Sequence, residues 1–227
     1  MALEHDPKLE QLSDQIARDL RKKIVTGRLP QGAQISIRDV AHSAGVSFIP
    51  ARDAVKSLAR EGLVTVRPRA GAFVTRLTPK DIREIYEVRL FLEPQVAGQT
   101  VERVTPAWIK RAWEIYELSA MVPLEAVYND YETFQRNMDL DSALHRHFIS
   151  LADNDKLMTI YDDLNTHWRL SRILFRMDPR KNPTPRQEHK AIIEAYEARD
   201  AKAAAEAIRE HISNALRVHL EQLNEKE

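Results

Sequence analysis

Several aspartates and histidines in the second half of the chain have the residue types and spacing of metal ligands. Asp141 and His145 are four residues apart, as are Asp163 and His167, so each pair shares one face if its segment is helical. A carboxylate and an imidazole on one face can bind a divalent cation together. The spacing does not choose between the two pairs, and each is equally explained as a polar pair on a helix surface.

Two further histidines are expected to lie level with each other. His189 and His211 stand 10 and 11 residues on either side of an expected turn at 199–200. If the flanking segments form antiparallel helices, the two side chains reach a similar height, although height does not show that they face each other. Asn214 follows His211 by three residues, on nearly the same face, so it is a candidate to point inward.

Capping signals divide the chain after residue 77 into helices. Thr78-Pro79, Thr105-Pro106 and Thr184-Pro185 each place a capping threonine before a proline in the first turn. The three prolines of 178–185 predict a loop. The predicted helices cover roughly 80–102, 106–120, 124–138, 140–152, 155–177, 185–198 and 200–223. No β-rich run interrupts them, so 78–227 is predicted to be an all-α helical bundle.

Composition excludes several classes of protein. The 227 residues contain no cysteine, which excludes disulfide frameworks, cysteine-based zinc fingers and thiol nucleophiles. No apolar run approaches the roughly 20 residues that span a bilayer, and the N-terminus lacks the apolar stretch of a signal peptide, so we expect a cytoplasmic protein with no membrane partner. The 34 basic residues balance the 34 acidic residues. Residues 1–77, however, hold 13 Lys and Arg against 8 Asp and Glu, whereas 78–227 hold 21 against 26.

The basic first third has the pattern of a winged helix-turn-helix. Apolar residues recur at helical spacing from Leu9 to Ile24, and Ser36 and Ser47 are placed to cap two short helices around a turn at Gly45. Alternating residues on either side of the basic loop 67–71 then predict a β-hairpin. Three helices and a hairpin in 1–77, followed by the helical bundle in 78–227, make a mainly α protein of two domains.

Side chains suited to DNA gather on this part of the chain. Arg52 and Lys56 are four residues apart on the face of the third helix opposite its apolar stripe. Taken singly, such cations are ordinary solvated charges, but together on this scaffold they predict a DNA surface. The candidate DNA-binding residues are Arg38, Ser47, Phe48, Arg52, Lys56, Arg69 and Gly71.

The segment GRLPQGAQISIRDVAHSAGVSFIPARDAVKSLAREGLVTVRPRAGAFV resembles the DNA-binding domain of the GntR superfamily of bacterial transcription regulators. The resemblance implies that Arg38 and Arg52 contact DNA and that Gly71 is the wing glycine. One position departs from the family, which usually has arginine where this chain has Phe48. A phenyl ring cannot donate a hydrogen bond to guanine, although it can pack on a thymine methyl group, so the operator is expected to differ from the family's common one.

The second part resembles the FCD-type effector domain of the FadR-like branch, through EIYEVRLFLEP, DLDSALHRHFISLADNDKL and EHKAIIEAYEARDAKAAAEAIREH. The resemblance implies a divalent metal, zinc, nickel or manganese, held by Asp141, His145, His189 and His211. It places Arg89 at an effector pocket, although Arg89 also has Glu93 four residues away as an ordinary ion-pair partner. His167 and Asn214 are the other candidate effector-binding residues.

Two functions follow from these observations. The first is a regulator, expected to repress, that binds an inverted-repeat DNA operator as a homodimer and senses a small organic acid at the metal-containing pocket. The second is a metal-dependent hydrolase that uses the same Asp/His₃ site, since a metal with open positions activates water. The chain has no His-Glu-x-x-His motif, no Gly-x-Ser-x-Gly motif and no phosphate loop, and a hydrolase would leave the basic first third unexplained. We therefore expect that the protein is not an enzyme.

Overall fold

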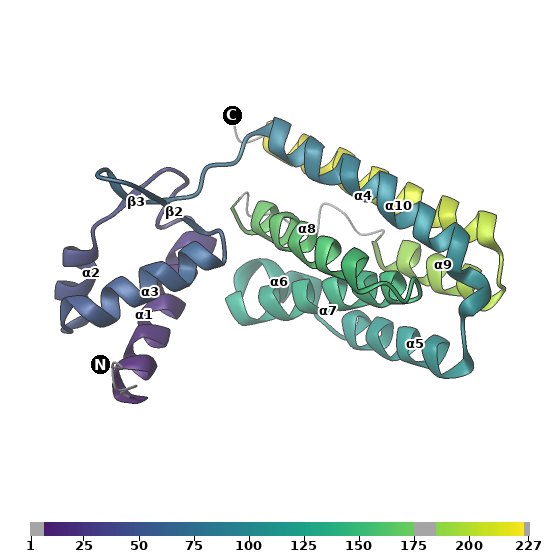
Figure 1. The fold of residues 1–227 in the computed structure, drawn as a ribbon, viewed down its shortest axis with the longest axis horizontal. Helices are drawn as coiled ribbons and strands as arrows, with labels where there is room; N and C mark the ends of the chain where they lie inside the picture. Colours follow the sequence, from purple (N-terminus) through teal and green to yellow (C-terminus); the bar gives the residue numbers. More distant parts are fainter. Residues whose placement is uncertain (1–6, 175–184, 225–227) are drawn as a thin grey trace. The chain divides into compact units, whose positions relative to one another are not determined.

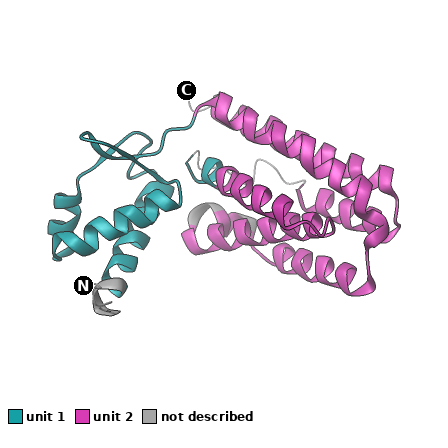
Figure 2. Cartoon of the chain, in the orientation of Figure 1, with its two compact units in different colours: residues 1–77, 170–176 teal, residues 78–169, 177–227 magenta. Residues whose placement is uncertain are grey.

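The computed structural model describes residues 7–174 and 185–224 and divides into two compact units (Figure 2). One unit comprises Met1–Leu77 with Leu170–Arg176, and the other comprises Thr78–Arg169 with Met177–Glu227. Among the described residues, no helix is both long enough and apolar enough to cross a membrane.

The first unit is a small helical domain with a three-stranded sheet. Its elements are α1 (Pro7–Val25), β1 (Gln34–Ile35), α2 (Ile37–Ala44), α3 (Phe48–Arg60), β2 (Val64–Arg67) and β3 (Gly71–Val74). Figure 1 labels all of them except β1. The strands are antiparallel in the order β1-β3-β2, with Thr65 opposite Phe73. The predicted hairpin is therefore present, and β1 adds a strand that the sequence analysis did not predict. Two residues are too few to show an alternating pattern.

The turn between α2 and α3 depends on residue types that the sequence displays. Ser36 accepts a hydrogen bond from the backbone N–H of Asp39 and so caps α2, while Gly45 ends that helix at φ 66°, in the left-handed region. Ser47 precedes α3 but makes no such capping bond. The third residue of α3 is Pro50, which lacks the backbone N–H that a capping serine usually binds.

The second unit is built entirely of helices. Its elements are α4 (Pro79–Thr100), the 3-10 helix η1 (Val101–Arg103), α5 (Pro106–Ala120), α6 (Leu124–Asn129), α7 (Tyr131–Ser150), most of α8 (Asp155–Leu174), α9 (Pro185–Glu197) and α10 (Ala201–Asn224). Helices α4 and α10 pack along each other, and α9 packs on α10 (Figure 1). The predicted mainly α fold, a winged helix-turn-helix followed by a helical bundle, is confirmed.

One predicted helix boundary is wrong. The sequence predicts one helix that ends at 138 and another that begins at 140, whereas the chain breaks at Asp130 and α7 continues without interruption from Tyr131 to Ser150. The Asp130 carboxylate accepts hydrogen bonds from the backbone N–H and the hydroxyl of Thr133, which starts the helix there. The predicted loop over 178–185 and the Thr184 cap lie outside the described residues, except that Pro185 begins α9.

Candidate metal centre

Three histidines from three helices meet in the interior of the helical unit. The Nε2 atoms of His145 and His211 are 3.1 Å apart, and His189 Nε2 is 3.3 Å from each of them. All three side chains are buried. The separate segments that carry these residues in the sequence thus converge on one point.

Helix geometry explains why the three side chains meet. His145 lies on α7, His189 on α9 and His211 on α10. Helices α9 and α10 are joined by a tight turn in which Arg199 has a φ of 55° and the Asp200 side chain accepts a hydrogen bond from the Ala203 N–H. His189 and His211 lie 10 and 11 residues from this turn, which brings them to a similar level along the two helices, and the structure shows that their rings also meet.

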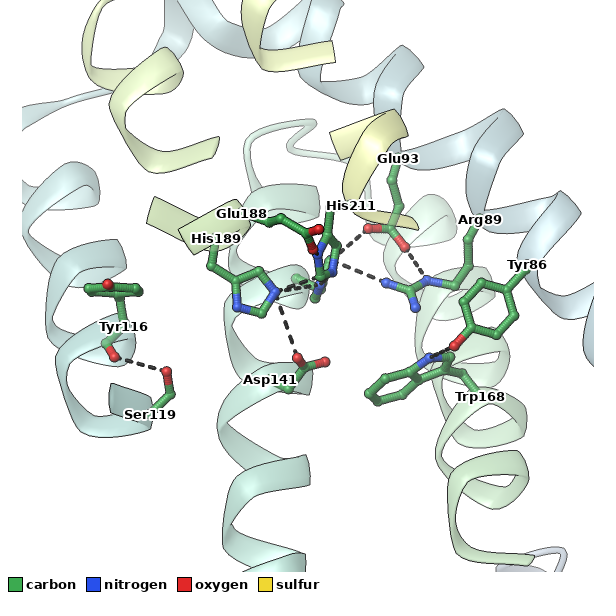
Figure 3. Close-up of polar contacts among 11 residues, drawn as sticks. Tyr86, Arg89, Glu93, Tyr116, Ser119, Asp141, Trp168, Glu188, His189 and His211 are labelled. Atoms are coloured by element: carbon green, nitrogen blue, oxygen red, sulfur yellow. Dashed lines mark hydrogen bonds and ion pairs between the residues drawn. The ribbon is translucent and has the colours of Figure 1, made fainter. Parts of the chain in front are cut away.

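Two glutamates contact the Nδ1 atoms of His145 and His211, on the side of each ring that faces away from the cluster. Glu93 on α4 lies 2.7 Å from His145 Nδ1, and Glu188 on α9 lies 2.8 Å from His211 Nδ1. Asn214 donates a hydrogen bond to the other Glu188 oxygen at 2.8 Å. Figure 3 shows Glu188 beside His211 and Glu93 beside Arg89. Such carboxylate partners fix the tautomer and the ring orientation of histidines that ligate metals.

The tautomer has a direct consequence for the centre of the cluster. An ionised carboxylate only accepts hydrogen bonds, so Nδ1 of His145 and of His211 must carry the proton. In the neutral ring, each Nε2 then presents a lone pair, and two lone pairs 3.1 Å apart repel each other. The Arg89 Nη2 atom also approaches His145 Nδ1, at 3.3 Å, but the shorter contact to Glu93 decides where the proton is. A cation between the rings would turn this repulsion into three bonds.

The dimensions of the cluster suit a metal ion. Three nitrogens that are each about 2.1 Å from a tetrahedral ion are roughly 3.4 Å apart, and in an octahedral site about 3.0 Å. The observed 3.1–3.3 Å falls within this range. Asp141 Oδ1 lies 3.7 Å from His189 Nε2 and borders the cluster one helical turn before His145 (Figure 3). Asp141 lies outside the group of mutually close donor atoms that the three histidines form, so its role as a fourth ligand stays a prediction.

Formal charge gives a second test of fit. The carboxylates of Glu93, Glu188 and Asp141 surround the cluster, and the guanidinium of Arg89 is the cation that contacts it. Three negative charges and one positive charge leave two negative charges, which a divalent cation neutralises. Buried charges are stable only when they are paired in this way.

Burial favours the neutral form of His189 and His211. Removal from water lowers the pKa of His189 well below the usual histidine value, and the neighbouring His211 lowers it further. Burial likewise lowers the pKa of His211, although its hydrogen bond to Glu188 partly opposes this. A neutral imidazole is the form that binds metal, so no proton has to leave these two rings at neutral pH.

Arg89 lies in the wall of this site rather than apart from it. Its Nε donates to Glu93 Oε1 at 2.6 Å, so the ion pair expected from the sequence as an alternative is present, and both side chains are buried. Burial raises the pKa of the Glu93 carboxyl. The charge of Arg89 and the hydrogen bonds that Glu93 makes with Arg89 and His145 outweigh this effect and lower its pKa to about 2. The guanidinium also lies over the ring of Trp168, 5.1 Å from its centroid. Contact with an effector stays a prediction for Arg89.

The structure separates the two aspartate–histidine pairs that the sequence could not rank. His145 belongs to the cluster and Asp141 borders it through His189, whereas Asp163 and His167 are exposed on α8. Asn214 reaches the site through Glu188, as its position after His211 suggested. Glu93 as a histidine partner and Glu188 were missed. The available signal for Glu188 was a carboxylate directly before His189.

The candidate DNA-binding side chains are largely open to solvent. Arg38, Ser47, Phe48, Lys56 and Arg69 are exposed, and the Arg52 side chain is 43% exposed. Asp53 lies between the two cations of α3, at 3.5 Å from Arg52 and 3.6 Å from Lys56. Gly71 has a φ of 111°, which L-amino acids with a side chain rarely adopt, and it begins the second strand of the wing.

Both units match known protein families. Residues 12–74 match the model of bacterial regulatory proteins of the gntR family, and residues 84–214 match the FCD domain. The uncharacterized HTH-type transcriptional regulator YdhC of Bacillus subtilis is 28% identical over 200 residues, which cover 88% of this chain and 87% of that protein. The gluconate operon transcriptional repressor of the same species is 33% identical over 149 residues, 66% of this chain and 58% of that protein.

Solved structures share the fold. McbR/YncC of Escherichia coli has a TM-score of 0.66 at 18% identity and covers 93% of this chain and 98% of its own. A GntR regulator from Rhodococcus has a TM-score of 0.67 at 22% identity and covers 92% of this chain and 97% of its own. The chain therefore belongs to the GntR family of bacterial transcription regulators, in the group with an FCD domain. These matches identify a regulator rather than an enzyme, and they do not support the hydrolase interpretation.

Replacing any of the three histidines of the cluster by alanine should lower the affinity for zinc by more than the roughly 10–100-fold that loss of an outer partner causes, because a direct ligand is lost. His145→Ala, His189→Ala and His211→Ala are compared with His167→Ala, which removes an exposed histidine and should bind zinc like the wild type. Competition with a chromogenic chelator measures the affinity, and far-UV circular dichroism checks the fold. Equal zinc affinity in all four folded variants would exclude this centre.

Removing the charge of either glutamate partner should weaken metal binding without removing a ligand. Glu93→Gln and Glu188→Gln are each expected to lower zinc affinity about 10–100-fold, because the imidazole loses the carboxylate that orients it. Glu84→Gln, on the same helix as Glu93 but exposed, is the control. Glu188→Gln is the cleaner variant, since Glu93→Gln also leaves Arg89 buried without its counter-ion. Unchanged affinity in both folded variants would contradict the role given to the glutamates.

Proposed function

We propose that this protein is a ligand-responsive repressor that binds an inverted-repeat operator as a homodimer and senses a small organic acid at a metal-containing pocket. The buried three-histidine cluster beside Asp141 carries the proposal, since it gives the helical unit a site with a defined chemistry. A regulator of this kind acts on chromosomal DNA, so we place it in the cytoplasm.

A divalent cation is the cofactor that this donor set favours. Three imidazole nitrogens and one carboxylate suit zinc, nickel or manganese, and the formal charge of the surrounding side chains suits a charge of +2. A bound divalent metal supplies a positive centre that attracts the carboxylate of a small acid. The protein residues would hold the ion, with His145, His189, His211 and Asp141 as ligands.

The acid would reach a site in which most polar groups already have partners. Arg89 donates its Nε–H to Glu93, so the donors at Nη1 and Nη2 are what it offers to an incoming carboxylate. Effector binding changes DNA affinity only if the acid binds the DNA-competent and DNA-incompetent states with different affinity. The gluconate operon transcriptional repressor of Bacillus subtilis and the transcriptional repressor RspR of Escherichia coli are similar to this chain, which favours repression over activation.

The DNA side of the proposal predicts that Arg52→Ala loses specific operator binding while the fold survives. The reason is that Arg52 projects from the exposed face of α3 and that a base-contacting arginine contributes strongly to recognition. Arg60→Ala removes the same charge from the far end of the same helix and should weaken binding only modestly, in a salt-dependent way. Fluorescence anisotropy at physiological salt measures both. Equal loss in the two variants would mean that only overall charge matters.

The sensing side predicts a metal-dependent response to acids. Genomic fragments selected by the zinc-loaded protein should share a short inverted repeat, and one member of a pool of carboxylic acids should release that repeat. His211→Ala, if folded, should still select the repeat in the absence of acid but no longer respond. A wild-type protein that selects the repeat and ignores every acid in the pool, with and without metal, would contradict the proposed sensor.

A further inference from the structure

The first two residues of α3 are large, apolar and exposed, on a helix that also carries the cations Arg52 and Lys56 with Asp53 beside them. Phe48 is 48% exposed and Ile49 is 51% exposed, although both are large hydrophobic side chains. The rest of the helix behaves normally, because its apolar residues from Pro50 to Leu58 are buried in the unit. Phe48 and Ile49 are therefore not needed for the core, and their exposure has to be explained in another way.

The surroundings indicate what the apolar pair meets. Arg52 and Lys56 follow on the same helix, Arg38 lies near the start of α2, and all three are at least partly exposed. This region belongs to the part of the chain that matches the gntR-family DNA-binding domain. A polyanion is the partner that complements such charge, and the apolar feature that duplex DNA offers in its major groove is the 5-methyl group of thymine.

The start of the helix supports the same partner independently. In α2, α4 and α5, the capping Ser or Thr accepts a hydrogen bond from the backbone N–H of the third helical residue. In α3 that residue is Pro50, so the Ser47 side chain makes no capping bond. The Ser47 hydroxyl and the N–H groups of Phe48 and Ile49 thus remain at the beginning of the helix, where a DNA phosphate is readily bound.

We infer that Phe48 and Ile49 determine operator specificity by packing on thymine methyl groups, while Ser47 and the helix start hold the adjacent phosphate and fix the register. This inference rests on the proposed function, since it requires that the protein binds a specific operator. It assigns sequence discrimination in the first turn of α3 to apolar contact, and leaves hydrogen-bonded recognition to Arg52. Each half-site should then contain one or two thymines whose methyl groups contribute to affinity.

Deoxyuridine substitution tests the inference, because uracil keeps every hydrogen-bonding group of thymine and lacks only the methyl group. The operator is first obtained by selection of genomic fragments, and each thymine of a half-site is then replaced singly. At one or two positions the affinity of the wild type should fall roughly four-fold for each methyl group removed. When the same thymine is replaced in both half-sites, the two fold-losses of affinity should multiply.

Variants assign the effect to the two side chains. Phe48→Ala and Ile49→Ala should each bind the thymine operator more weakly. Each variant should also no longer respond to uracil at the base that the replaced side chain contacts, which completes a double-mutant cycle. Ile160→Ala, which truncates an exposed apolar residue of the helical unit, should keep the wild-type pattern. Phe48→Arg should shift the selected base at the Phe48 position toward guanine, which accepts two hydrogen bonds from arginine.

The possible failures are distinguishable. If the wild type binds a specific operator but no uracil substitution changes its affinity, or if the sensitivity persists in both alanine variants, the inference is overturned and the regulator function stands. If folded, zinc-loaded protein selects no shared repeat with or without the acid pool, the proposed function fails and the inference fails with it.

Discussion

The helical unit depends on an unusual constraint, which is that three imidazole nitrogens face one another at 3.1–3.3 Å inside the protein. Without a cation between them, two of these nitrogens present lone pairs to each other, because Glu93 and Glu188 hold their protons on the opposite side of the rings. The carboxylates of Glu93, which is buried, and Glu188, which is half-buried, therefore leave the three Nε2 atoms free to act together as metal ligands.

This constraint explains which helices have to be held together. The histidines come from α7, α9 and α10, and Glu93 brings in α4, which packs along α10. The Arg89–Glu93 ion pair is costly to bury alone, but it satisfies Glu93 and lets it orient His145. A metal would connect α7 to the consecutive helices α9 and α10, so its binding and the packing of the bundle are coupled.

Much of this arrangement could be predicted from the sequence, because it depends on local patterns. Helical spacing places Asp141 and His145 on one face, and the turn at 199–200 sets His189 level with His211. The outer partners depend on tertiary packing, which periodicity does not reveal. Glu93 is 52 residues from His145 in the sequence. The spacing of four residues predicts its ion pair with Arg89 correctly, but it does not reveal the contact with His145. The helix break was misplaced because the capping strength of Asp130 was overlooked.

The most direct test of the account is the X-ray absorption spectrum of the metal-loaded protein at the metal edge. A first shell of three imidazole nitrogens and carboxylate oxygen at about 2.0–2.2 Å, with the multiple scattering of histidine rings, is the predicted result. A shell of water oxygens without imidazole scattering would contradict it and would mean that the three facing nitrogens serve some purpose other than metal binding.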